Sequence, residues 1–131
     1  MTATGQSLSS EPLSRDACLR LLAGADLARV VLSVRALPAA LPARISLVGA
    51  DHLLLVSHED AVILAARRGD VISVQIDGLD PDGSTWSVMT SGIPTGADTG
   101  VELRPVMREA VDNGATLLAI PLSVVVGQRS R

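Results

Sequence analysis

The spacing of apolar and polar residues changes several times along the chain, and each change marks an expected element. Apolar residues three and four positions apart predict helices, whereas alternating aliphatic and polar residues predict strands. Ser14 before one apolar stretch and Gly24 after it are typical of a helix start and a helix end. The expected helices span residues 14–24, 58–68 and 101–113, and the expected strands span residues 27–35, 39–48, 53–57, 70–77, 85–92 and 115–127.

Two prolines interrupt the expected strands, Pro42 in the second and Pro121 in the last. Proline has no amide hydrogen for the sheet ladder, so Pro42 is expected at an edge or a bulge and Pro121 at a break or a bulge. Most successive strands have no helix between them, which favours an antiparallel barrel over a parallel doubly wound sheet. Residues 1–13 lack periodicity and are expected to form a flexible tail before one domain of residues 14–131. The predicted fold class is therefore mostly β.

Composition excludes several kinds of partner. The 131 residues carry a net charge of -3 and one aromatic side chain, so neither a phosphate-binding surface nor a base-stacking platform for nucleic acid is expected. One cysteine and two histidines are too few for a structural zinc site within the chain, and no metal site is expected. All 11 cationic side chains are arginines, which is typical of a GC-rich genome.

No segment of the sequence has the features of a membrane span or a secretory signal. The longest apolar runs are the length of a strand, far below the roughly 20 residues that cross a bilayer. The amino-terminal stretch has no cationic start followed by an apolar run. A cytoplasmic protein without membrane contact is expected.

Four segments of the chain resemble a known family in their amino-acid sequences and in the order in which they occur. They are SRDACLRLLAG, ARVVLSVRALPAALP, LDPDGSTWSVMTSG and AIPLSVVVGQR. Together they resemble the pyridoxamine 5′-phosphate oxidase-like family of flavin-binding split barrels, in its small actinobacterial branch, over roughly residues 14–129. The resemblance implies a six-stranded Greek-key split barrel, a homodimer, and FMN or, in some branches, a deazaflavin at the subunit interface.

The resemblance also implies where a flavin would lie, and this chain departs from the pattern at two places. Pro42, Ala43 and Arg44 stand where the branch carries a Pro-Val-Asn triplet that contacts the flavin. Arg44 thus replaces a small amide with a long cation. It is either a new contact for an anion or a surface arginine on an edge strand.

The second departure lies where the family holds the flavin phosphate. There a threonine-containing turn leads into Gly-(Ser/Thr)-Lys-Leu at a helix start, whose amides and lysine bind the phosphate. Here the turn contains Ser57 and His58, and Val62 and Ile63 occupy the lysine and leucine positions. Asp60 replaces the glycine, and Glu59 adds a further carboxylate. The resemblance therefore implies a degenerate phosphate site.

Four residues have more than one interpretation. Trp86 and Ser87 match a Trp-Ser pair of the family, where the indole would face a ligand or the dimer interface, or would simply fill the core. His58 is either an acid-base group or metal ligand, or a solvated residue at a helix start. Cys18 is expected to be a buried, inert thiol rather than a nucleophile.

Three functions remain open on the sequence alone. One is a flavin-dependent oxidoreductase, which the resemblance favours. Another is a non-catalytic homodimer that binds a different small molecule, with Arg44 as its anchor. The last is a structural homodimer whose pocket is filled by aliphatic side chains. No arrangement of Ser, His, Asp or Cys supports hydrolytic or covalent chemistry.

Overall fold

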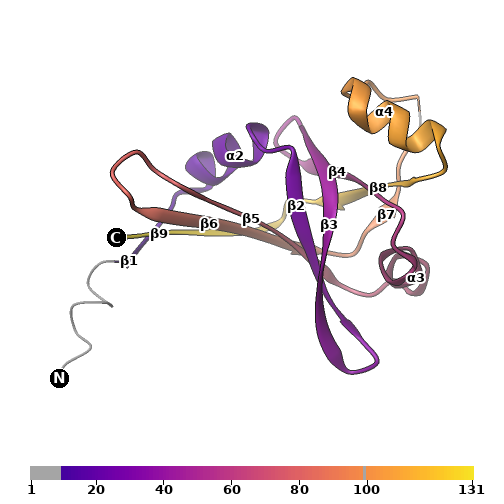
Figure 1. The fold of residues 1–131 in the computed structure, drawn as a ribbon, viewed down its shortest axis with the longest axis horizontal. Helices are drawn as coiled ribbons and strands as arrows, with labels where there is room; N and C mark the ends of the chain where they lie inside the picture. Colours follow the sequence, from indigo (N-terminus) through magenta and orange to yellow (C-terminus); the bar gives the residue numbers. More distant parts are fainter. Residues whose placement is uncertain (1–9, 99) are drawn as a thin grey trace.

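The computed structural model describes residues 10–98 and 100–131, which form one strongly curled antiparallel sheet with three helices packed on it (Figure 1). The helices are α2 (Arg15–Ala23), α3 (Asp60–Arg68) and α4 (Pro105–Asp112). The strands are β1 (Ser10–Pro12), β2 (Leu27–Val34), β3 (Leu37–Val48), β4 (His52–Ser57), β5 (Ile72–Leu79), β6 (Thr85–Gly92), β7 (Thr95–Gly96), β8 (Thr116–Pro121) and β9 (Val124–Ser130).

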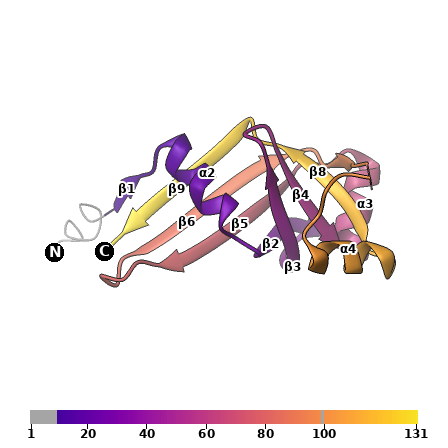
Figure 2. The same cartoon turned by 90° about the horizontal axis from the view of Figure 1, so that it is seen from above.

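The strands follow the order β1-β9-β6-β5-β2-β3-β4-β8-β7, and neighbouring strands pair antiparallel. Figure 2 shows β9, β6 and β5 lying side by side, while β2 and β3 lead across to β4 and β8. The sheet thus curls into two halves that share the β2–β3 hairpin. The mostly β, split-barrel class predicted from the sequence is confirmed.

The strand count differs from the six expected, for two reasons. Ser10–Pro12, assigned to a tail in the sequence, pair with β9, and the two-residue β7 pairs with β8. The last expected strand is divided into β8, which ends at Pro121, and β9. Pro121 therefore marks a break, which is one of the two outcomes expected for it. At Pro42, β3 pairs only with β2, because β4 begins pairing at Arg44. Pro42 therefore lies at a local edge, where a missing donor costs little.

Strand β4 is buried on both faces, which explains its uninterrupted apolar sequence. Leu53 and Leu55 point into the main core cluster, together with residues of β2, β3, β5 and α2. Leu54 and Val56 point the other way, into a second cluster with Met107 of α4. A strand covered on both sides loses the usual alternation of apolar and polar residues. Helix α4 is thus the cover of the outer face of β4.

Helix α2 packs closely against β9. Its start is capped by Ser14, whose hydroxyl accepts a hydrogen bond of 3.1 Å from the amide of Ala17. On its inner face, Cys18 lies so near Gly127 that a Cβ at this glycine would be 2.5 Å from the cysteine sulfur. Cys18 is buried, and the loss of solvation raises the pKa of its thiol. This environment agrees with an inert thiol.

Candidate functional site

A surface hollow of about 260 Å³ lies between β3 and the turn that leads from β4 into α3. It gathers five of the site residues expected from the sequence, which come from two segments of the chain: Pro42, Ala43, Arg44, Ser57 and His58. Glu59 and two alanines near α4, Ala110 and Ala115, complete much of its wall. The pairing of Arg44 with Val56 brings the two segments together.

Arg44 supplies the positive charge of this hollow. Its backbone pairs with Leu27 of β2 on one side and with Val56 of β4 on the other. The interpretation of Arg44 as a residue on an edge strand is therefore wrong, because β3 lies inside the sheet. Its neighbours Ala43 and Ile45 point into the core, so the alternation of a strand directs Arg44 to the outer face, where it is exposed. An exposed arginine at this place is available to an anion.

The turn before α3 combines features that attract and features that repel an anion. The hydroxyl of Ser57 is buried and accepts a hydrogen bond of 3.0 Å from the amide of Glu59. The first amides of α3 have no acceptor within the helix and point toward its amino-terminal end. Glu59, however, occupies the N-cap, and its carboxylate makes no capping hydrogen bond. A free carboxylate beside the positive end of the helix dipole competes with any bound anion.

Val62 and Ile63, expected at this site, do not line the hollow. Val62 is 0% exposed and belongs to the main core cluster. The pattern Val62, Ala65 and Ala66, at helical spacing, marks the inner face of α3 and could have revealed this from the sequence. In this chain, position 62 is a core position.

Trp86 and Ser87 lie away from Arg44, on opposite faces of β6. The indole of Trp86 is partly buried against the main core cluster and covers Gly78, where a Cβ would be 2.5 Å from the ring. Trp86 also lines a hollow of about 360 Å³ together with Arg20 of α2. Ser87 lines a smaller hollow with Gln128. Trp86 therefore both fills the core and faces a surface hollow.

Leu27, which was not among the site residues expected from the sequence, connects the hollow at Trp86 with the hollow at Arg44. It is 62% exposed and lines three hollows: the one at Trp86, the one at Arg44, and a third of about 270 Å³ between them. The third hollow is shared with Pro42 and Asp77. We call this run of three hollows the Leu27 groove. It can accept a ligand longer than any single hollow, and its middle combines the apolar Leu27 and Pro42 with the polar side chains of Arg29, Gln75 and Asp77.

Comparison with known proteins agrees with this architecture. A family model described as pyridoxamine 5′-phosphate oxidase matches residues 14–117. The chain belongs to this family. An uncharacterized protein of Mycobacterium tuberculosis, Rv0080, is 33% identical over 89% of this chain and 83% of its own length.

Two solved structures share the split-barrel fold of this family member. An FAD-binding protein from Mesorhizobium loti superposes with a TM-score of 0.74 at 19% identity, covering 93% of this chain and 97% of the other. The FAD binding protein from Mycobacterium smegmatis superposes with a TM-score of 0.67, also at 19% identity, over 93% and 99% of the two chains.

Other groups with catalytic potential have structural roles or stand alone in this family member. Asp80 forms an ion pair of 2.6 Å with Arg129, and Asp82 accepts a hydrogen bond of 2.9 Å from the amide of Ser84. Hydrogen bonding to the side chain and the amide of Ser84 lowers the pKa of Asp82. His58 is exposed, and the described residues contain no group of three His, Cys, Asp or Glu side chains placed for a metal. No helix within residues 10–98 and 100–131 is long and apolar enough to cross a membrane.

Proposed function

We propose that this chain is a flavin-binding protein that holds FMN, or a deazaflavin in its place, in the Leu27 groove and uses it for oxidoreductase chemistry. The observation that carries the proposal is the gathering of Pro42, Arg44 and Ser57 at the start of α3. A flavin phosphate fits this end, because a guanidinium and the first amides of a helix both favour an anion. A bound flavin would supply electron or hydride transfer.

The phosphate end is weakened in this chain, which supports a second candidate function. Glu59 places a carboxylate in the wall of the hollow, where it would repel a bound phosphate. The buried Val62 does not line the hollow, so position 62 supplies no cation to offset this carboxylate. The alternative is a non-catalytic homodimer that binds another small molecule through Arg44.

The flavin proposal predicts opposite effects of two substitutions on the affinity for FMN. Arg44→Ala should weaken binding about tenfold, because it removes a cation from the phosphate position. Glu59→Gln should strengthen binding by roughly the same factor, because it removes a competing charge. Titration of FMN, followed by the quenching of flavin fluorescence, measures both.

Matched controls for these two variants lie outside the groove. Arg67→Ala on α3 and Glu109→Gln on α4 change exposed charges of the same type and should leave the affinity for FMN unchanged. If Arg44→Ala and Glu59→Gln both bind FMN like the wild type, the phosphate does not bind at this end. Failure of FMN to bind any of the proteins would favour the second candidate function.

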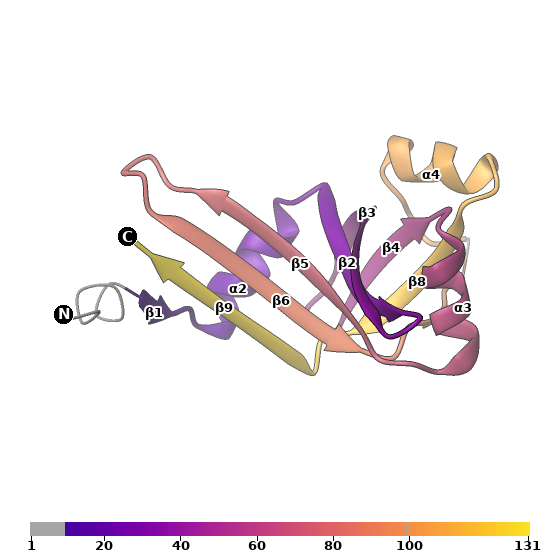
Figure 3. The same cartoon turned by 60° about the horizontal axis from the view of Figure 1, so that its bottom comes forward.

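We also propose that the chain is a homodimer in the cytoplasm. The outer face of β6 and β9 exposes Met89, Val124 and Val126, which the register places next to one another. Figure 3 shows β9, β6 and β5 side by side, and α2 packs its Cys18 against the inner face. The Leu27 groove consists of surface hollows, so a second subunit packed beside it would cover the exposed side of a bound flavin.

The dimer should dissociate when charges are placed on this face. Met89→Lys combined with Val126→Lys is expected to convert the dimer mass to the monomer mass in light scattering at micromolar concentration, because two desolvated ammonium groups would oppose association. Val48→Lys, an equally apolar and exposed position at the end of β3, is the control and should remain dimeric. A wild-type protein with only the monomer mass would remove the proposal.

A further inference from the structure

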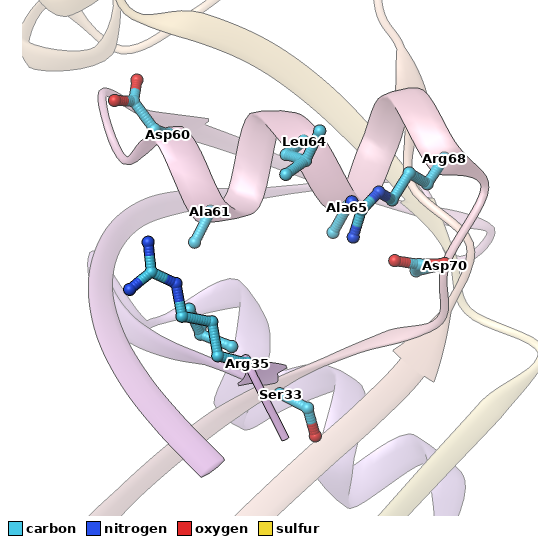
Figure 4. Close-up of a pocket in the computed structure, with 9 residues that line it drawn as sticks. Ser33, Arg35, Asp60, Ala61, Leu64, Ala65, Arg68 and Asp70 are labelled. Carbon is cyan, nitrogen blue, oxygen red and sulfur yellow. The ribbon is translucent and has the colours of Figure 1, made fainter. Parts of the chain in front are cut away.

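A cavity larger than any single hollow of the Leu27 groove lies outside that groove. It has a volume of about 680 Å³ and lies between the end of the β2–β3 hairpin and one side of α3 (Figure 4). None of its lining residues lines the hollow at Arg44. Its size is that of a small-molecule pocket.

The middle of this cavity is apolar. Val34 lies on the hairpin side, and Ala61, Leu64 and Ala65 lie on the helix side. Leu64 is 46% exposed, although it faces the cavity as a large aliphatic side chain. The free energy of the system falls when an apolar molecule displaces water from exposed aliphatic surface of this kind. The middle of the cavity therefore suits the apolar body of a ligand.

The two ends of the cavity differ in charge. At one end, the Arg35 guanidinium points toward Ala61, whereas the carboxylate of Asp60 points away from it (Figure 4). Arg35 forms no ion pair with any described residue. At the other end, Arg68 and Asp70 face each other, so positive and negative groups are both present. Only the Arg35 end carries a cation without a facing carboxylate.

The backbone is strained at the hairpin turn that contains Arg35. Arg35 and Ala36 have φ values of 52° and 66°, and they connect Val34 to its partner Leu37. Two-residue hairpin turns of this kind favour Asn-Gly, and a residue with a Cβ costs about 1–2 kcal/mol in the left-handed region. Strained positions concentrate at binding sites. This turn holds a long cation at the cavity, at a position where asparagine or glycine would be less strained.

We propose that this cavity binds an organic anion with a mostly apolar body, such as an aromatic or aliphatic carboxylate. Its anionic group pairs with the Arg35 guanidinium, which can donate two parallel hydrogen bonds to it. Its body packs against Leu64, and the Arg68–Asp70 end sets the limit of its length. This site is separate from the proposed flavin site and does not depend on it.

Fluorescence titration with 8-anilinonaphthalene-1-sulfonate, an apolar ring system with one sulfonate, tests the proposal. Arg35→Asn should weaken binding of this probe tenfold or more, because it removes the cation while asparagine suits the turn. The melting temperature should not fall, which separates the loss of binding from unfolding. Ala36→Gly is the matched control in the same turn, and its affinity for the probe should equal that of the wild type.

A second pair of variants tests the apolar wall. Leu64→Glu should weaken probe binding at least tenfold by placing a carboxylate in the cavity, whereas Arg67→Gln, outside the cavity on the same helix, should not. The proposal is overturned if the wild type does not bind the probe, or if Arg35→Asn binds it as well as the wild type. Displacement of the probe by excess FMN would also overturn it, since the probe would then occupy the flavin groove.

Discussion

Replacing Val62 with lysine should lower the free energy of unfolding by about 4 kcal/mol at pH 7. The family pattern, which has a phosphate-binding lysine at this position, would instead suggest that the substitution strengthens the binding of a phosphate. Val62 is 0% exposed in the main core cluster, however, so the new ammonium group would be surrounded by aliphatic side chains. Burial can lower the pKa of a lysine from about 10.4 to about 5–6, and each pKa unit is equivalent to about 1.4 kcal/mol.

The pH dependence of this loss has a definite sign. The folded-state pKa of the new side chain lies below its unfolded-state value of about 10.4, so folding releases a proton at pH 7. The destabilisation is largest below the folded-state pKa, and it shrinks as the pH rises toward 10. Urea unfolding at pH 7 and pH 9.5 should therefore show most of the loss recovered at the higher pH.

The control for Val62→Lys is Leu64→Lys on the same helix. Leu64 is 46% exposed, so its replacement should change the free energy of unfolding by less than about 1 kcal/mol at either pH. A Val62→Lys protein as stable as the wild type, with a higher affinity for FMN, would show that position 62 reaches the phosphate after all.

The case of Val62 shows how far the sequence could define the site. Local spacing placed Arg44 on a strand and Ser57 at a helix start, and the structure brings these residues together. Which side of α3 faces the core depends on how the helix packs against the sheet. Alignment with a family motif does not show this packing, so it assigned Val62 to the phosphate site. The periodicity of Val62, Ala65 and Ala66 contained the answer, because it predicts the buried face of the helix.

Features that depend on distant contacts could not be predicted in the same way. The three helices and most strand positions follow from local patterns, because alternation and capping are encoded within a few residues. Strands β1 and β7 are three and two residues long, and they exist only because β9 and β8 offer free edges. Likewise, Leu27 and Ala110 meet at one hollow through the order of the sheet, which their positions in the sequence do not reveal.

Replacing Arg104 with methionine should lower the free energy of unfolding by about 3 kcal/mol. Arg104 precedes the first residue of α4, and its guanidinium donates hydrogen bonds to the carboxylate of Asp26 and the carbonyl of Ile45. A weaker bond of 3.5 Å reaches the carbonyl of Ala25. This one side chain therefore ties the start of α4 to β3 and to the loop before β2.

The two main bonds of Arg104 should contribute unequally. The side chain of Asp26 is 64% exposed, and exposed ion pairs contribute only about 0–1 kcal/mol. The carbonyl of Ile45 is partly buried, and losing a charged donor there costs about 1.5–3 kcal/mol. Methionine keeps much of the apolar volume but donates no hydrogen bond, so it isolates this loss.

Asp26→Asn is the matched variant, because it removes the charge of the ion pair and leaves the bond to Ile45 in place. Urea unfolding at pH 7 should show a loss below about 1 kcal/mol for Asp26→Asn, against about 3 kcal/mol for Arg104→Met. Equal losses in the two variants would mean that the ion pair, rather than the bond to the Ile45 carbonyl, holds α4 in place. Because α4 carries Ala110 into the wall of the Leu27 groove, the same tie also positions one side of the proposed flavin site.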